Sequence, residues 1–215
     1  MEKVDPEFDR SISREIGHGF PVTAAERESV TELTMQRVRD LGPIAEFRSL
    51  EQLIMAGCDP VSVRQIKSLK KLRMLIIEDS ALRDISGIGS LPLLNFSMQR
   101  NFVADIETLL YVPTLLQVDV TGNPLSDFSY REIIPKLVEK GCRVRFSKEL
   151  EWRVTRRLQT AGVGVACYES DRGYRLCRPG LRLTDTPQYG HPVITKEDAE
   201  GLLKRNPEEA LTFFS

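Results

Sequence analysis

The 215-residue chain has little of what most enzymes and metal-binding proteins need. Its only histidines are His18 and His191, and neither lies in a recognisable catalytic motif. The four cysteines lack the spacing of a metal-binding motif. The stretch Gly162-Val163-Gly164 completes no phosphate-binding glycine loop. We therefore expect no catalytic residue, no metal, no cofactor and no enzyme.

The chain also lacks a long apolar run and an excess of charge of one sign. No run approaches the roughly 20 residues of a membrane span, and the segment from Met1 to Arg14 is too polar for a secretory signal. The formal net charge is −1, which argues against a general attraction to nucleic acid or to an anionic membrane. These absences predict a cytoplasmic protein with reduced cysteines, and they leave export by a signal-less secretion system open.

A short apolar pattern is present instead, and it recurs five times between Glu28 and Lys136. The first inward column is Thr31, Leu53, Leu75, Phe96 and Val118. The second inward column is Leu33, Met55, Ile77, Met98 and Val120. A polar column follows, with Gln36, Cys58, Ser80, Asn101 and Asn123. Because side chains alternate across a strand, each copy predicts a short strand with two apolar side chains pointing inward.

This pattern resembles the leucine-rich repeat family, in the short form seen in internalins and in regulatory subunits of type-one protein phosphatase. The resemblance covers roughly half of the chain and is clearest in residues 115–127 and in the copy that begins at Leu72. It implies an α/β solenoid of about 22-residue repeats, with parallel strands and an irregular or 3₁₀ convex side. Stacking is needed because one copy cannot bury its apolar face alone. The asparagines are expected to bind buried backbone groups in the turn after each strand.

Three segments are predicted. Residues 1–27 form an arm and a helical cap, because Thr23 and Glu26 make a capping box that starts a helix over the open edge of the first repeat. Residues 28–146 carry the repeats, a closing helix and a last strand. Residues 147–215 form a C-terminal α+β appendage. It is expected to contain a helix capped by Ser147 and a hairpin that turns between Ser170 and Gly173.

The concave face of the strands is the candidate site. Ile54, Met74 and Ile76 are expected to form an exposed apolar cluster with polar and charged neighbours, as a protein-binding patch requires. The alternative is that these three side chains pack under the N-terminal arm or the appendage. The predicted partner-binding residues are Ile54, Met74, Ile76, Glu78, Asp79, Asn95, Ser97, Gln99, Arg100, Gln117 and Asp119.

We predict a non-catalytic protein-binding module that acts as an intracellular adaptor or inhibitor. An immunity protein that inhibits a bacterial toxin is one form, and a phosphatase regulator is the form implied by the family resemblance. The alternative is a small thiol or other enzyme in the appendage, centred on Cys167 or His191, for which the repeats recruit the substrate.

A third reading concerns Arg153, Arg156 and Arg157, which lie on one flank of the predicted appendage helix. They are suited to phosphate or an acidic partner, or they form a solvated face balanced by nearby acidic groups. The appendage lacks the interleaved aromatic residues of a nucleic-acid platform, so nucleic acid is not an expected partner.

Overall fold

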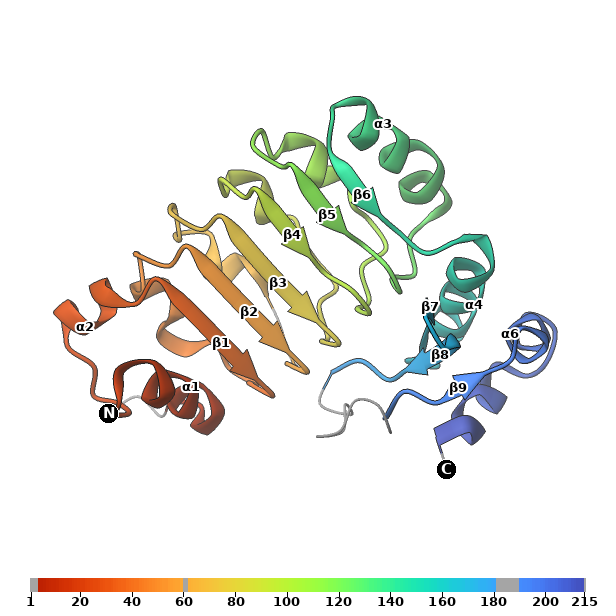
Figure 1. Cartoon of the computed structure of the whole chain (residues 1–215), viewed down its shortest axis with the longest axis horizontal. Coiled ribbons are helices and arrows are strands. Elements are labelled where there is room, and N and C mark those ends of the chain that lie inside the picture. Colours follow the sequence, from red (N-terminus) through yellow and green to blue (C-terminus); the bar gives the residue numbers. More distant parts are fainter. Residues whose placement is uncertain (1–3, 60–61, 181–189, 215) are drawn as a thin grey trace.

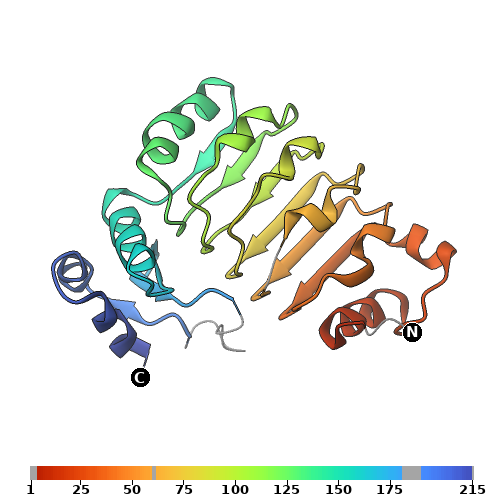
Figure 2. The same cartoon turned by 180° about the vertical axis from the view of Figure 1, so that it is seen from behind.

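The structure is a computed structural model that describes residues 4–59, 62–180 and 190–214. One sheet of six parallel strands runs in chain order through β1 (Glu32–Gln36), β2 (Gln52–Ala56), β3 (Met74–Glu78), β4 (Asn95–Ser97), β5 (Gln117–Asp119) and β6 (Arg143–Arg145). Short 3₁₀ or π turns alternate with these strands, at η1 (Gly42–Glu46), η2 (Val63–Ile66), η3 (Ile88–Ser90), η4 (Glu107–Tyr111) and η5 (Ser129–Ile133). Figures 1 and 2 show the strands along one face and the short helices along the other. This is a leucine-rich repeat solenoid, as the repeat pattern predicts.

The strand register confirms the inward columns of the second to fifth copies. Leu75 lies between Leu53 and Phe96 in the sheet, and all three side chains are buried. The prediction for the first copy is wrong by two residues, because Leu33 rather than Thr31 pairs with Leu53. The first repeat is shorter than the second, so a constant spacing counted backwards from Leu53 overshoots the strand.

Buried asparagines close the turns after β4 and β5, as predicted. Asn101 Oδ1 accepts the Leu82 N–H at 3.2 Å, and Asn123 Oδ1 accepts the Val103 N–H at 3.1 Å. The Nδ2 group of Asn101 donates to three backbone carbonyls, those of Ile77, Met98 and Gln99. Ser80 occupies the same column with a shorter side chain, and its recorded partners are the Cys58 N–H and the Glu78 carbonyl. Each asparagine therefore ties two neighbouring repeats together more fully than the serine does.

The helix α1 (Pro6–Ile16) covers the start of the solenoid. Its Phe8 and Ile12, one helical turn apart, are fully buried in the solenoid core. The helix α2 (Ala24–Ser29) begins at the predicted capping box but has no buried residue. The prediction that α2 covers the first repeat is therefore wrong. The helix α1 does so, because it carries the apolar side chains that α2 lacks.

The solenoid closes with α3 (Ile134–Glu139) and β6, and α4 (Glu149–Thr160) follows. The predicted cap of α4 is wrong by one residue: the Glu151 carboxylate accepts the N–H of Lys148, at 2.5 Å, and Lys148 is the capping residue. Ser147 instead accepts the Gly122 N–H through its Oγ, at 2.9 Å. The serine thus binds the solenoid rather than the helix that follows it.

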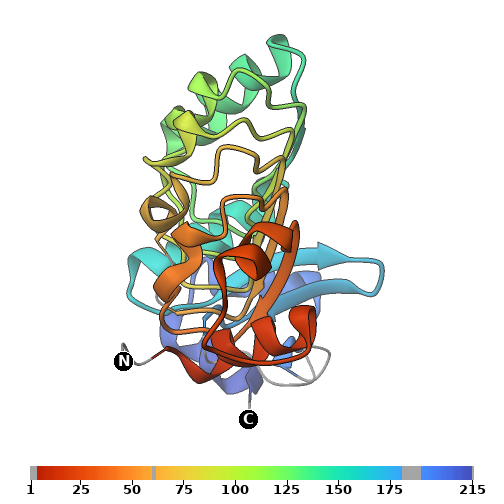
Figure 3. The ribbon, with the colours of Figure 1, turned by 90° about the vertical axis from the view of Figure 1, so that its left-hand side faces the viewer.

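The rest of the appendage is a small antiparallel sheet with two short helices. The sheet contains β7 (Ala166–Ser170), β8 (Gly173–Cys177) and β9 (Val193–Ile194), and the helices are α6 (Lys196–Leu202) and η6 (Pro207–Phe214). The predicted hairpin between β7 and β8 is confirmed. Figure 3 shows this hairpin, in light blue, projecting on the side of the molecule where the strands of the solenoid lie.

The appendage packs against the solenoid at the edge where the parallel strands end (Figure 1). Trp152 Nε1 of α4 donates to the Leu125 carbonyl at 2.8 Å, and its ring stacks on Tyr130 with the ring centroids 3.9 Å apart. Gln159 Nε2 donates to the Asn101 carbonyl at 3.2 Å. These contacts fix α4 to the turns of the last repeats.

Leu75 and Ile76 are neighbours that should respond oppositely to a charge. Leu75→Glu should unfold the solenoid, because it buries a carboxylate in the core. Ile76→Glu should change the free energy of unfolding by less than about 1 kcal/mol, because its side chain lies on the outer side of the sheet. Urea denaturation followed by circular dichroism tests both variants, and the reverse order would show that the register is off by one residue.

The asparagine column gives a second stability prediction. Asn101→Ala should lower the free energy of unfolding by about 2–4 kcal/mol, because it leaves several buried backbone groups unpaired. Ser80→Ala is the matched control and should cost about 1 kcal/mol, because fewer recorded bonds are lost. Equal losses in urea denaturation would contradict the proposed role of the asparagines.

Candidate functional site

The outward side chains of β1 to β6 form a surface that we call the sheet face. Ile54 and Ile76 are directly paired there between β2 and β3, and Met74 lies two residues before Ile76. All three are half-buried. Neither apolar core of the described residues includes them. Within the described part of the chain, they therefore form an apolar patch on the sheet that belongs to neither core.

Polar side chains surround the apolar patch on the side of β4. Glu78 Oε1 accepts a hydrogen bond from Ser97 Oγ at 2.9 Å and another from Gln99 Nε2 at 3.2 Å. Asn95 of β4 is the direct strand partner of Met74. All four residues are half-buried, and Glu78 holds Ser97 and Gln99 in place, so they present a polar surface next to the apolar patch.

The sheet face continues over β5 and β6. Gln117 is the neighbour of Asn95 in the sheet and is half-buried. Asp119 is buried, and its carboxylate accepts the Thr121 N–H at 3.0 Å and pairs with Arg145 Nε at 3.5 Å. The Arg145 side chain is 69% exposed and that of Asp119 is 7% exposed, so the accessible charge of this ion pair is the positive charge of Arg145.

Asp79 and Arg100 do not lie on the open sheet face, where the sequence places them. Asp79 directly follows β3, Arg100 lies three residues after the end of β4, and both have a left-handed backbone, with φ of 49° and 52°. The guanidinium of Arg100 donates two hydrogen bonds to the carboxylate of Asp79, from Nε to Oδ1 at 2.5 Å and from Nη2 to Oδ2 at 2.8 Å. Gly122 occupies the same position in the next repeat, and a Cβ there would lie 2.8 Å from Arg100 Cγ. Glycine therefore leaves the space through which the arginine side chain runs.

Burial and charge act in opposite directions on this ion pair. Burial alone would raise the pKa of Asp79, but the hydrogen bonds and charge of Arg100 outweigh it and lower the pKa below its ordinary value. Arg100 also lies over the ring of Tyr168, with its guanidinium carbon 4.9 Å from the ring centroid. The pair is therefore ionised and enclosed between the solenoid and the appendage.

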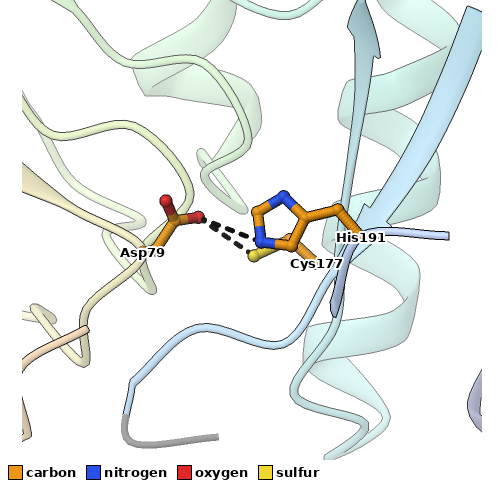
Figure 4. A group of neighbouring side chains, drawn as sticks. All are labelled: Asp79, Cys177 and His191. Carbon is orange, nitrogen blue, oxygen red and sulfur yellow. Dashed lines mark hydrogen bonds and ion pairs between the residues drawn. The ribbon is translucent and has the colours of Figure 1, made fainter. Parts of the chain in front are cut away.

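Cys177 and His191 of the appendage contact Asp79, beside its ion pair with Arg100 (Figure 4). Cys177 Sγ donates to Asp79 Oδ1 at 3.0 Å, and His191 Nε2 lies 3.8 Å from the same oxygen. Gly180 N–H donates to the backbone carbonyl of Asp79 at 2.7 Å. One aspartate thus receives three groups that follow it by roughly one hundred residues in the chain.

The imidazole of His191 is held from one side only. Its Nδ1 lies 2.7 Å from the hydroxyl of Tyr168, whereas Nε2 has no hydrogen-bond partner among the described residues. Burial, together with the charges of Arg100 and Arg175, lowers the pKa of His191 against the opposing effect of Asp79. The ring is therefore neutral near pH 7.

Cys167, one of the two centres of the alternative enzyme hypothesis, is buried, as is Cys177. Cys167 lies in the appendage core, and its backbone N–H and carbonyl bind Thr155 Oγ1. Cys167 is opposite Leu176 in the hairpin rather than opposite Cys177. Burial raises the pKa of both thiols, that of Cys177 well above its ordinary value. Neither sulfur is an exposed or activated nucleophile.

The arginines on α4 are partly engaged by the chain itself. Arg156 pairs with Asp127 at 2.5 Å, and Arg157 Nε donates to the Leu202 carbonyl at 3.1 Å. Arg153 is exposed. Two of the three cations thus serve contacts between α4 and its neighbours, one of them an ion pair with an acidic side chain.

Comparison with solved structures identifies similar folds. An internalin (InlF) from Listeria monocytogenes has a TM-score of 0.54 at 17% identity, over 71% of this chain and 53% of the other. Internalin C2 of the same organism has a TM-score of 0.39 at 15% identity, over 67% and 87% of the two chains. The functional domain of InlJ, also from that organism, has a TM-score of 0.34 at 14% identity, over 70% and 44%.

The match to InlF supports the leucine-rich repeat fold, and this chain spans about half of that protein's length. No known protein family and no curated protein matches the sequence. In the part of the chain that the structure describes, no helix has the length and apolar character needed to cross a membrane.

Two arginines that pair with aspartates give a matched test of the buried edge, by which we mean the contact of Asp79 and Arg100 with Cys177 and His191 of the appendage. Arg100→Ala should lower the free energy of unfolding by about 3–5 kcal/mol and speed amide exchange in β8, because it leaves the Asp79 charge buried without its partner. Arg145→Ala should cost less than about 1 kcal/mol, because that arginine is mostly exposed. Chemical denaturation and hydrogen exchange give the two values, and similar losses would contradict the contrast between the pairs.

Proposed function

We propose that the protein binds another protein through the sheet face and catalyses no reaction on it. The observation that carries this proposal is the apolar patch of Ile54, Met74 and Ile76, which adjoins a polar surface and belongs to neither core of the described residues. An apolar centre with polar surroundings suits a protein partner. The internalin-like repeat fold supports a protein-binding module as well.

The appendage adds a second surface beside the sheet face. Its β7–β8 hairpin projects on the strand side of the solenoid (Figure 3), and exposed Asp171 and Arg172 lie at its tip. A partner that binds the sheet face would therefore also contact the charged tip of this hairpin, which we call the charged wall, at the edge where the strands end. Such a wall would orient the partner, because rim charges influence specificity more than affinity.

We propose further that the protein acts as an adaptor or inhibitor in the cytoplasm. The four cysteines are unpaired and buried, as suits a reducing compartment. An inhibitor of a toxin enzyme is one form, because a preorganised surface without its own chemistry can block an active site. Regulation of a phosphatase is the other form, and it is supported by the resemblance of the repeats to phosphatase regulatory subunits.

A thiol enzyme centred on the appendage is the competing proposal. Cys167 and Cys177 are fully buried, so a substrate has no direct access to either sulfur. The variant Cys167→Ala separates the two proposals. A binding module should keep its partner and its biological effect in this variant, whereas a thiol enzyme centred on Cys167 would keep its partner and lose the effect.

The binding proposal is tested by affinity capture from a native extract with three baits. We expect Ile76→Glu to lose at least one protein that the native chain retains, because a charge replaces the centre of the apolar patch. Val138→Glu is the matched control. Its exposed aliphatic side chain lies on α3, outside the sheet face, so the captured proteins should be unchanged.

Quantitative mass spectrometry compares the three captured sets, and circular dichroism confirms that the baits are folded. The proposal would be contradicted if the folded Ile76→Glu bait retained every protein that the native chain and Val138→Glu both capture.

A further inference from the structure

Three side chains of metal-binding type converge where the appendage meets the solenoid. They are Asp79 after β3, Cys177 at the end of β8, and His191 shortly before β9 (Figure 4). Their ligating atoms all lie within 4.8 Å of one another, and all three residues are buried. We propose that Asp79, Cys177 and His191 bind a zinc ion that fastens the appendage to the solenoid. This proposal is independent of what the sheet face binds.

The Nε2 atom of His191 faces the other two side chains of the cluster. Its side chain is 5% exposed, and Nε2 has no hydrogen-bond partner among the described residues although Asp79 Oδ1 is 3.8 Å away. Buried polar atoms without a partner are rare and call for an explanation. A metal ion between Nε2, the carboxylate and the thiol sulfur provides one.

Tyr168 supplies the outer contact that a metal-bound histidine needs. Its hydroxyl lies 2.7 Å from His191 Nδ1, on the side of the ring opposite the cluster. Ligating histidines almost always use their second ring nitrogen in such a hydrogen bond, which fixes the tautomer and the orientation of the ring. With Tyr168 accepting the Nδ1–H, the lone pair of Nε2 is left for the ion.

The spacing of the ligating atoms suits zinc. Zinc takes sulfur at about 2.3 Å and nitrogen or oxygen at about 2.0–2.2 Å in tetrahedral geometry, so its ligands lie roughly 3.3–3.6 Å apart. Cys177 Sγ and Asp79 Oδ1 are 3.0 Å apart, and His191 Nε2 and Asp79 Oδ1 are 3.8 Å apart. Shifts of about half an ångström or less bring both pairs into this range.

Negative groups at the site offset the charge of the ion. Zinc binding displaces the proton of the Cys177 thiol, which passes to the solvent. The negative groups are then the Cys177 thiolate, Asp79 and Glu78, whose Oε2 lies 3.5 Å from Arg100 Nη2. The positive groups are the zinc ion, Arg100 and Arg175, whose charge also acts on His191. Arg100 donates to both oxygens of Asp79, through Nε to the ligating Oδ1 and through Nη2 to Oδ2, and thus serves as a partner of the ligating carboxylate.

The ligand set selects the metal class and leaves one position for solvent. Thiolate and imidazole favour zinc over calcium or magnesium, which prefer oxygen ligands. A cavity of about 360 Å³ is lined by Asp79 and His191, so a water molecule from it completes the fourth position. The ion would hold together groups that lie 98 residues apart in the chain, and it would stabilise their contact by binding the folded state.

The experiment uses the full chain, stripped of metal by a chelator and then titrated with zinc or cobalt. We expect the native protein to bind a single zinc ion per chain, to gain thermal stability on binding, and to show thiolate-to-cobalt charge-transfer absorption with cobalt. Cys177→Ser should lose this absorption. Cys167→Ser is the matched control, because its sulfur lies in the appendage core, and it should behave as the native chain does.

Three results would overturn the proposal. They are a native chain that shows no thiolate-to-cobalt absorption, a Cys177→Ser chain that keeps it, and a folded Cys167→Ser chain that loses it. Tyr168→Phe keeps all three ligands and so remains informative if Cys177→Ser does not fold. Its cobalt affinity should fall about 10- to 100-fold, because the outer hydrogen bond to His191 is removed. An unchanged affinity would contradict the assigned orientation of the histidine.

Discussion

The attachment of the appendage to the solenoid depends on the bidentate ion pair between Arg100 and Asp79. Both residues lie in the turns after their strands, and both take a left-handed backbone that non-glycine residues rarely adopt. The pair is buried, and a charge left there alone would be costly, so each side chain requires the other. Once fixed, the Asp79 carboxylate presents its inner oxygen to Cys177 and its backbone carbonyl to Gly180. The appendage is thereby attached to the strand ends instead of the sheet face.

This attachment separates two surfaces with different uses. The strand ends are filled by the molecule's own C-terminal elements, while the apolar patch of Ile54, Met74 and Ile76 stays outside both cores of the described residues. The hairpin of β7 and β8 then borders the sheet face on one side (Figure 3). A rigid apolar strip beside a charged wall is a surface suited to one partner in one orientation.

Local periodicity was enough to predict the repeats, because an apolar dyad per strand and a capping asparagine are properties of neighbouring residues. Leu75 and Asn101 illustrate this, since each does in the fold what its column requires. The first repeat was misplaced because its length differs, and periodicity carries no information about one shortened copy. The helix α1 was missed as the cap because the apolar face of Phe8 and Ile12 is short and lies in a charged segment.

The buried edge could not be predicted from the sequence, because it depends on contacts between distant parts of the chain. Asp79 and Arg100 sit in strand-following columns, where a repeat pattern predicts exposure, and only the docking of the appendage buries them. Cys177 and His191 form no spaced motif with each other. The same limit applies to the contact between Tyr168 and His191, which lie 23 residues apart in the chain.

The central claim is that Ile54 and Ile76 face outward for a partner while the leucines beside them are buried. Methyl NMR in the presence of a soluble paramagnetic agent tests it most directly. We expect strong broadening of the Ile54 and Ile76 methyl signals, sharp signals from Leu53 and Leu75, and protection of both isoleucines when a captured partner is added. Isoleucine signals that stay sharp in the free protein, or that remain broadened in the complex, would contradict it.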